Sequence, residues 1–251
     1  MLTLYTIGCI ALYFAQDNLL FNPSHLSEDF VFWNGQEVEV PTGDGITLNS
    51  VWIKNKGSKG VILYLHGNRG SNRRCLRQAE MFEGLGYDIF MPDYRGFGKT
   101  EGTITSEKQL FRDVQKVYDF LKTKYDETQI AIAGYSLGTG MASHLASVNN
   151  PGRLILLAPY VSFIDMKNRT FPILPNFLIK YPLSNRKHLK KVKCPVVLFH
   201  GTEDEIIPFD SSVQLEKMNP EQIKLIRLQG TGHRGTIFSN RLRSVLSDFL
   251  I

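Results

Sequence analysis

The clearest pattern along the chain is a series of short apolar runs that begins near Val61, separated by stretches with helical periodicity. Each run is apolar at successive positions rather than at alternate ones, which is typical of strands buried on both faces of a sheet. Such strands occur in parallel sheets that helices cover on both sides. The predicted strands span residues 61–66, 87–91, 129–134, 154–158, 196–200 and 224–228.

A different pattern precedes this series. Residues 38–40 and 46–53 alternate between apolar and polar on either side of a Thr-Gly-Asp-Gly sequence, which predicts a β-hairpin. Ser106 and Gln109 form a capping-box pattern ahead of an apolar stripe, which predicts a helix. Further helices are predicted at residues 72–85, 136–147, 211–218 and 237–249. A hairpin followed by repeated β-α units indicates an α/β fold with a mainly parallel sheet.

The first residues form an apolar segment. Residues 2–15 carry no charge, and Thr3 and Thr6 are their only clearly polar side chains. This length is short of the roughly 20 residues that a membrane-spanning helix needs, and a signal peptide would have a basic start. Two interpretations stay open for residues 1–25: a helix packed on the apolar surface of the main domain, residues 26–251, or a membrane anchor.

Composition sets limits rather than a function. A chain of 251 residues with 43% hydrophobic and 21% charged residues is ordinary globular protein, which excludes a disordered, collagenous or coiled-coil chain. The net charge is +5, yet residues 1–53 contain six acids and no Lys or Arg. Residues 54–251 therefore carry +11. Cys9, Cys75 and Cys194 are widely spaced, which predicts free thiols, no zinc site and a cytoplasmic location, with membrane association through residues 1–25 left open.

The strongest chemical signal is the sequence Gly-Tyr-Ser-Leu-Gly at residues 134–138. It follows a predicted strand and opens a helix rich in small residues, which is the context that the G-x-S-x-G nucleophile elbow requires. The flanking glycines leave room for a tight turn, and the helix start offers free backbone N–H groups to developing negative charge. We therefore predict that Ser136 is a catalytic nucleophile rather than a helix cap.

A serine hydroxyl needs a base, and the base needs an acid that orients it. His233 lies in a glycine-rich loop after the last predicted strand and is the predicted base, whereas His66 and His200 end strands and are interpreted as structural. Asp204, in the loop after residues 196–200, is the predicted acid, with Asp165 as the alternative. The chain order is then Ser, Asp, His, as in the α/β-hydrolase fold.

Acyl transfer also needs two N–H donors aimed at an oxyanion. The first is predicted at Leu137, which follows the nucleophile. The second is predicted at Asn68, in the loop after strand 61–66. Only the backbones of these residues matter for this role.

Taken together, these motifs resemble the α/β-hydrolase superfamily over residues 37–249. Within it, the apolar start, Phe-Asn-Pro at 21–23, His-Gly-Asn and Asp-Tyr-Arg-Gly look like Bem46/ABHD13-type serine hydrolases, and more distantly ABHD17-type depalmitoylases. The resemblance implies an eight-stranded sheet, no metal and no diffusible cofactor. It does not fix a substrate, since this fold supports many chemistries. The matching motifs lie at residues 66–70, 92–98, 134–138, 201–208 and 232–233.

The predicted function is hydrolysis of carboxylic esters with short to medium acyl chains. Alternatives are a lysophospholipase, a monoacylglycerol lipase or an acyl-protein thioesterase at a membrane, and less favoured ones are a peptidase or a non-catalytic scaffold. The long connection at residues 160–194 is interpreted as a cap or lid. Its Phe163, Phe171 and Phe177 are candidates for an acyl pocket, or for a small core of the insertion itself.

The basic residues suggest partners. Arg69, Arg73, Arg74 and Arg77 and the lysine-rich connection at 160–194 account for the +11, and both are expected to border the active-site edge of the sheet. They form either a solvated surface or a basic rim for an anionic membrane or substrate. No interleaved aromatic and basic stripe supports nucleic-acid binding.

Overall fold

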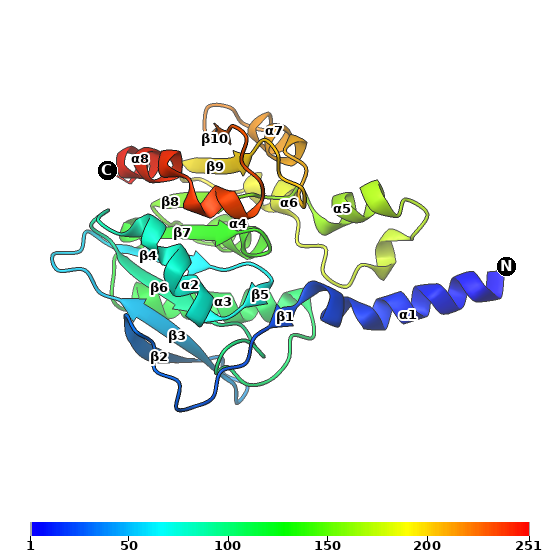
Figure 1. Cartoon of the computed structure of the whole chain (residues 1–251), viewed down its shortest axis with the longest axis horizontal. Coiled ribbons are helices and arrows are strands. Elements are labelled where there is room, and N and C mark those ends of the chain that lie inside the picture. Colours follow the sequence, from blue (N-terminus) through cyan, green and yellow to red (C-terminus); the bar gives the residue numbers. More distant parts are fainter. Residues whose placement is uncertain (1, 251) are drawn as a thin grey trace.

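The computed structural model describes residues 2–250 and contains one eight-stranded sheet flanked by helices (Figure 1). Its strand order is β10-β9-β8-β7-β4-β6-β3-β2. The strands are β2 (Gln36–Pro41), β3 (Thr47–Ile53), β4 (Val61–Leu65), β6 (Asp88–Pro92), β7 (Ile130–Tyr135), β8 (Arg153–Leu157), β9 (Val196–Gly201) and β10 (Ile223–Leu228). A separate parallel pair joins β1 (Asn22–Pro23) to β5 (Arg69–Gly70).

The α-helices are α1 (Leu2–Leu20), α2 (Asn72–Ala79), α3 (Glu107–Lys122), α4 (Gly138–Val148), α5 (Phe163–Thr170), α6 (Asn185–Leu189), α7 (Asp210–Glu216) and α8 (Asn240–Phe249). The short 3₁₀ helices of residues 2–250 are η1 (Glu80–Phe82), η2 (Glu127–Gln129), η3 (Asn176–Leu178) and η4 (Arg234–Phe238). The predicted helix at 72–85 therefore ends early. Gly84 could not have been part of it, because it adopts a positive φ, which an α-helix does not allow.

The sheet is parallel apart from β2 and β3, so the predicted fold class is confirmed. Every residue of β4, β7 and β9 is buried, which agrees with their continuous apolar runs. Along β4, Leu63 packs in the core on the side of α3 and α4, and Ile62 packs in the core on the side of α2 and α8. Because side chains alternate between faces, one apolar strand supplies both layers.

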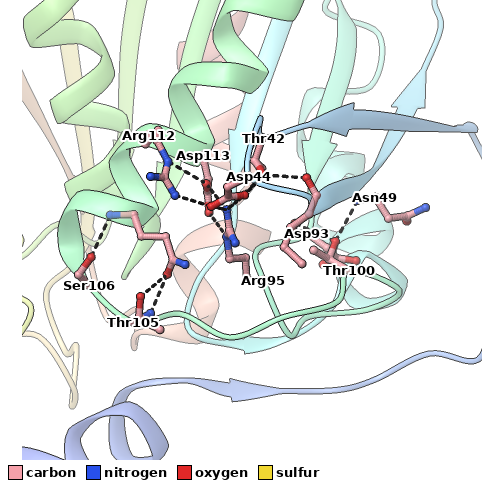
Figure 2. Close-up of polar contacts among 12 residues, drawn as sticks. Thr42, Asp44, Asn49, Asp93, Arg95, Thr100, Thr105, Ser106, Arg112 and Asp113 are labelled. Carbon is pink, nitrogen blue, oxygen red and sulfur yellow. Dashed lines mark hydrogen bonds and ion pairs between the residues drawn. The ribbon is translucent and has the colours of Figure 1, made fainter.

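A buried ion-pair network fixes the loop after β6 against α3 and the hairpin (Figure 2). The Arg95 guanidinium donates to both Asp113 oxygens, at 2.6 and 2.9 Å, and to Asp44 at 2.8 Å. The side chains of Arg95 and Asp113 are 5% and 6% exposed. A charge buried this deeply depends on its partner.

Asp113→Ala is expected to lower the free energy of unfolding by about 3 kcal/mol, or roughly 6–12 °C in Tm, because it leaves the buried Arg95 charge with Asp44 alone. Thermal melting of purified variants measures this. Asp119→Ala is the matched control on the same helix, since its exposed pair with Lys122 should contribute under about 1 kcal/mol. Equal melting temperatures for the two variants would contradict the expectation.

His144 on α4 is half-buried and lies beside the buried His188 on α6. The His144 ring stacks on Phe111 with centroids 3.8 Å apart, and the His188 ring lies 5.0 Å from His144. Burial lowers the pKa of both imidazoles to about 4, and the charge of the nearby Lys187 acts in the same direction. Both histidines are therefore neutral in the folded protein at pH 7.

Stability is expected to fall as the pH decreases from about 6.5 to about 4. In that range the unfolded histidines bind protons and the folded ones do not, so protons favour unfolding. The loss is about 1–2 kcal/mol per histidine, allowing for solvent screening. Urea unfolding across this range measures it, and His188→Phe should flatten the dependence. An unchanged slope in the variant would contradict this account.

Helix α1 projects away from the main body beside the segment that contains α5 and η3 (Figure 1). Its contacts to that segment are largely polar: Tyr5 donates to Ile173 O at 2.9 Å, Gln16 donates to Leu178 O at 2.7 Å, and Lys180 pairs with Asp17. Its exposed large apolar side chains are Tyr5, Ile7, Ile10, Tyr13, Phe14 and Leu19. At the end of the helix, Leu20 packs against the core of the domain, whereas the side chains just named stay exposed.

At 19 residues, α1 is longer than the apolar run that predicted it. Within residues 2–250, no helix combines the length and the apolar character needed to cross a bilayer. Met1, the first residue of the predicted N-terminal segment, lies outside the described residues, as does Ile251.

The lysines at the end of the long connection lie elsewhere than expected. Lys190, Lys191 and Lys193 come just before β9, and the Lys193 ammonium lies 3.5 Å from the side-chain oxygen of Asn150, which precedes β8. They therefore border the amino ends of the strands, whereas Ser136 follows the carboxyl end of β7. The prediction that they share the active-site edge was wrong, because the chain has crossed back over the sheet before β9 begins.

Candidate active site

Ser136 occupies a sharp turn between β7 and α4 with a positive φ of 52°. This conformation is unusual for a residue with a side chain. The turn is possible because glycines flank it: a Cβ at Gly138 would lie 2.0 Å from the Leu65 carbonyl oxygen, and one at Gly134 would lie 2.6 Å from that of Gly138. The local sequence therefore holds Ser136 at the carboxyl edge of the sheet.

The structure brings Ser136, His233 and Asp204 together. His233 Nε2 lies 3.1 Å from Ser136 Oγ, and His233 Nδ1 lies 2.7 Å from Asp204 Oδ2. The carboxylate can only accept, so Nδ1 carries a hydrogen and Nε2 is left to accept the serine proton. His233 and Asp204 lie 97 and 68 positions after Ser136 in the sequence, yet the three form one hydrogen-bonded chain.

Asp204 is held as a carboxylate. Its side chain is fully buried, and burial alone would raise its pKa. Hydrogen bonds from His200 and His233 outweigh that effect and keep the pKa of Asp204 well below its usual value. The backbone N–H groups of Ile206 and Ile207 donate to its other oxygen at 2.9 and 2.8 Å.

His200 is a second imidazole on the same carboxylate, a contact that the sequence did not indicate. Its Nε2 lies 3.1 Å from Asp204 Oδ2 and 3.0 Å from Ile207 O, and its Nδ1 lies 2.6 Å from the Ser212 hydroxyl. Both partners of Nε2 are acceptors, so Nε2 carries a hydrogen. The interpretation of His200 as a residue that bonds to loop backbone was therefore incomplete: it also fixes Asp204.

The two predicted oxyanion donors flank the serine. Among residues 2–250, neither the Asn68 nor the Leu137 backbone N–H has a hydrogen-bond partner. The Asn68 loop is fixed from the other side, since its side chain donates to Leu20 O at 2.8 Å and its carbonyl accepts from Asn22 N. The Leu137 carbonyl accepts from the buried Tyr160 hydroxyl at 3.1 Å, a support that the sequence did not reveal.

A hollow of about 160 Å³ opens beside Ser136, and Tyr135, Ile206 and Arg234 contribute to its wall. Phe163, Phe171 and Phe177 do not line it. Phe163 packs on Tyr160 at a centroid distance of 4.5 Å, while Phe171 and Phe177 are 58% and 83% exposed. The last two are thus exposed in a segment that extends toward α1, and their part in an acyl pocket stays a prediction.

Arg74 and Gln78 on α2 also line this hollow. The sequence predicts Arg74 at the active-site edge, whereas it does not indicate Gln78. Their helical spacing of four residues places them on one face of α2. Within the described part of the chain, no cluster of three or more His, Cys, Asp and Glu side chains has the arrangement to hold a metal ion.

The sheet order, the strained serine turn and the Ser-His-Asp contacts define an α/β-hydrolase fold. Comparison with known families agrees: the family described as "Serine aminopeptidase, S33" matches residues 56–187. This match covers more than half of the chain, so the protein belongs to that family of α/β-hydrolases.

Curated relatives include lysophosphatidylserine lipase ABHD12. The protein from Danio rerio is 28% identical over 227 residues, which cover 78% of this chain and 59% of the relative. The one from Mus musculus is 30% identical over 210 residues, 69% of this chain and 52% of the relative. The chain thus spans little more than half the length of these relatives. An uncharacterized protein from Mycobacterium tuberculosis is 29% identical over 227 residues, which cover 85% of this chain and 80% of that protein.

Solved structures share the fold. The esterase Pf2001 from Pyrococcus furiosus superposes with a TM-score of 0.72 at 22% identity, covering 92% of this chain and 97% of the esterase. Est1E from Butyrivibrio proteoclasticus superposes with a TM-score of 0.65 at 20% identity, covering 85% of this chain and 96% of the Est1E chain. Identities this low carry the fold and not the substrate.

Proposed function

We propose that this protein is a serine hydrolase that cleaves carboxylic esters through an acyl-enzyme. The observation that carries the proposal is the continuous hydrogen-bonded chain from Ser136 through His233 to a buried, ionised Asp204. Membership in a family of serine hydrolases and the esterase fold support it.

The proposed mechanism follows from the geometry. Ser136 Oγ attacks the ester carbonyl while His233 Nε2 takes its proton, and the Asp204 carboxylate stabilises the imidazolium. The Asn68 and Leu137 N–H groups bind the developing oxyanion. His233 then gives its proton to the leaving alcohol, and water, activated by the same base, releases the acid.

The hollow at Ser136 favours small acyl groups. At about 160 Å³ it is smaller than the roughly 300–1,000 Å³ of pockets that bury drug-sized ligands.

A lipid substrate is the second candidate. The name of the ABHD12 relatives, lysophosphatidylserine lipase, favours it, as do the exposed apolar side chains of α1, which suit contact with a membrane interface. We also propose that the protein is related to Bem46/ABHD13-type hydrolases within the superfamily, and that residues 160–194 act as a cap or lid.

Hydrolysis of a p-nitrophenyl ester series from two to sixteen acyl carbons tests the proposal, with and without anionic vesicles. We expect kcat/KM to be highest for short to medium chains. A rate that rises only for long chains in the presence of vesicles would favour the lipid candidate instead. Absence of hydrolysis across the whole series would contradict the proposed function.

A further inference from the structure

Next to the catalytic hollow lies a larger cavity of about 750 Å³, which we call the arginine pocket. It is formed by the start of α2, by β5 and by the segment that follows α1. Arg69 and Arg74 line both this pocket and the hollow at Ser136, so the two cavities lie side by side. The basic residues of its wall are Arg69, Arg73, Arg74, Arg77 and His25.

The arginines of this pocket form no ion pair in the part of the chain that the structure describes. Among residues 2–250, none of the four pairs with a carboxylate, and no Asp or Glu lines the pocket. Arg73 and Arg77 stand four residues apart on α2, where like charges repel. Elsewhere on the surface, Arg112 pairs with Asp44 and Arg169 pairs with Asp165. Four uncompensated guanidinium groups around one cavity therefore favour a bound anion.

Apolar side chains also line the arginine pocket. The Arg73 guanidinium lies 5.7 Å from the Phe30 ring centre, which leaves its edge free to donate. Val31 and Trp33 are 81% and 58% exposed, although both are large apolar side chains. A ligand with an anionic group and an apolar part would cover both kinds of surface.

We propose that the arginine pocket binds the phosphate group of the ester substrate while the ester carbonyl lies at Ser136. This rests on the proposed function and names its substrate class: an acyl ester whose alcohol part carries a phosphate. One guanidinium group can donate two parallel hydrogen bonds to two oxygens of a phosphate. Several arginines around one pocket therefore favour a phosphate over a neutral hydroxyl. The cavity is large enough for a phosphorylated alcohol, and the small hollow holds the acyl end.

The test compares two soluble substrates that differ only in the phosphate, 1-hexanoylglycerol and 1-hexanoylglycerol 3-phosphate. We expect wild type to prefer the phosphate ester at least tenfold in kcat/KM. The double variant Arg73→Gln/Arg77→Gln should lose this preference through a higher KM and keep its rate on the neutral ester. These two arginines line only the arginine pocket. Lys190→Gln/Lys191→Gln removes the same charge at the other edge of the sheet and should behave as wild type.

Other outcomes separate the possible errors. Equal kcat/KM for both esters in wild type, or equal losses on both in the double variant, would overturn the phosphate site and leave the esterase intact. Inorganic phosphate should compete with the phosphate ester in wild type and much less in the double variant, and equal competition in both would place the ion elsewhere and also overturn it. Failure of wild type to hydrolyse either ester, together with the p-nitrophenyl series, would count against the proposed function itself.

Discussion

Replacing Ser136 with alanine is expected to reduce kcat/KM for a p-nitrophenyl ester by roughly 10⁴- to 10⁶-fold. The hydroxyl is the group 3.1 Å from His233 Nε2, and without it no acyl-enzyme forms. Residual hydrolysis would come from the oxyanion donors and from substrate binding. Initial rates over a range of enzyme concentrations measure the effect.

The fold should survive this change, because alanine is as able as serine to adopt the positive φ of the turn. Among residues 2–250, Ser136 Oγ forms no hydrogen bond other than that to His233. Ser147→Ala is a matched control on the neighbouring helix, where the hydroxyl only bonds to His144 O. It should retain wild-type kinetics. Ser136→Ala activity within tenfold of wild type, in a folded protein, would contradict the assignment of the nucleophile.

Asp204→Asn is expected to lower kcat by about 10³- to 10⁴-fold with a smaller change in KM. Each Asp204 oxygen accepts two hydrogen bonds, one oxygen from His233 and His200 and the other from backbone N–H groups. An amide has one acceptor oxygen, so its NH₂ must face one of these two pairs of donors. Either placement removes support for the imidazolium that forms during attack.

The control for this prediction is Asp165→Asn, since the sequence left Asp165 open as the alternative acid. In the structure Asp165 lies on α5 and pairs with Arg169 at 3.0 Å. We expect its substitution to leave kcat within about twofold. Steady-state kinetics at pH 7–8 compare the two variants. A larger loss in Asp165→Asn than in Asp204→Asn would reverse the assignment of the acid.

The features that sequence predicts best are those that a local stretch of chain determines alone. The turn at Ser136 depends on a strand, two glycines and a helix start within a few residues, and the structure has all of them. The strands were predictable for the same reason, because burial on both faces makes each one continuously apolar. Fold class and family follow from these local signals in order along the chain.

The features that the sequence did not reveal depend on the path that loops and connections take in space. The bond from His200 to Asp204 requires the loop after β9 to fold back over its own strand end, which neither residue signals. Phe171 and Phe177 look like core residues by composition, yet their prolyl segment runs along α1. The positions of Lys190 and Lys193 depended on where the connection crosses the sheet. In each case the chain path, rather than residue type, decided the outcome.

The most direct test of the central claim is the site of covalent labelling by a fluorophosphonate probe, mapped by mass spectrometry of the digested protein. The account predicts one adduct, on the peptide that contains Ser136, absent from Ser136→Ala and formed far more slowly in His233→Ala. An adduct on another serine, or a folded wild-type protein that does not react, would contradict it.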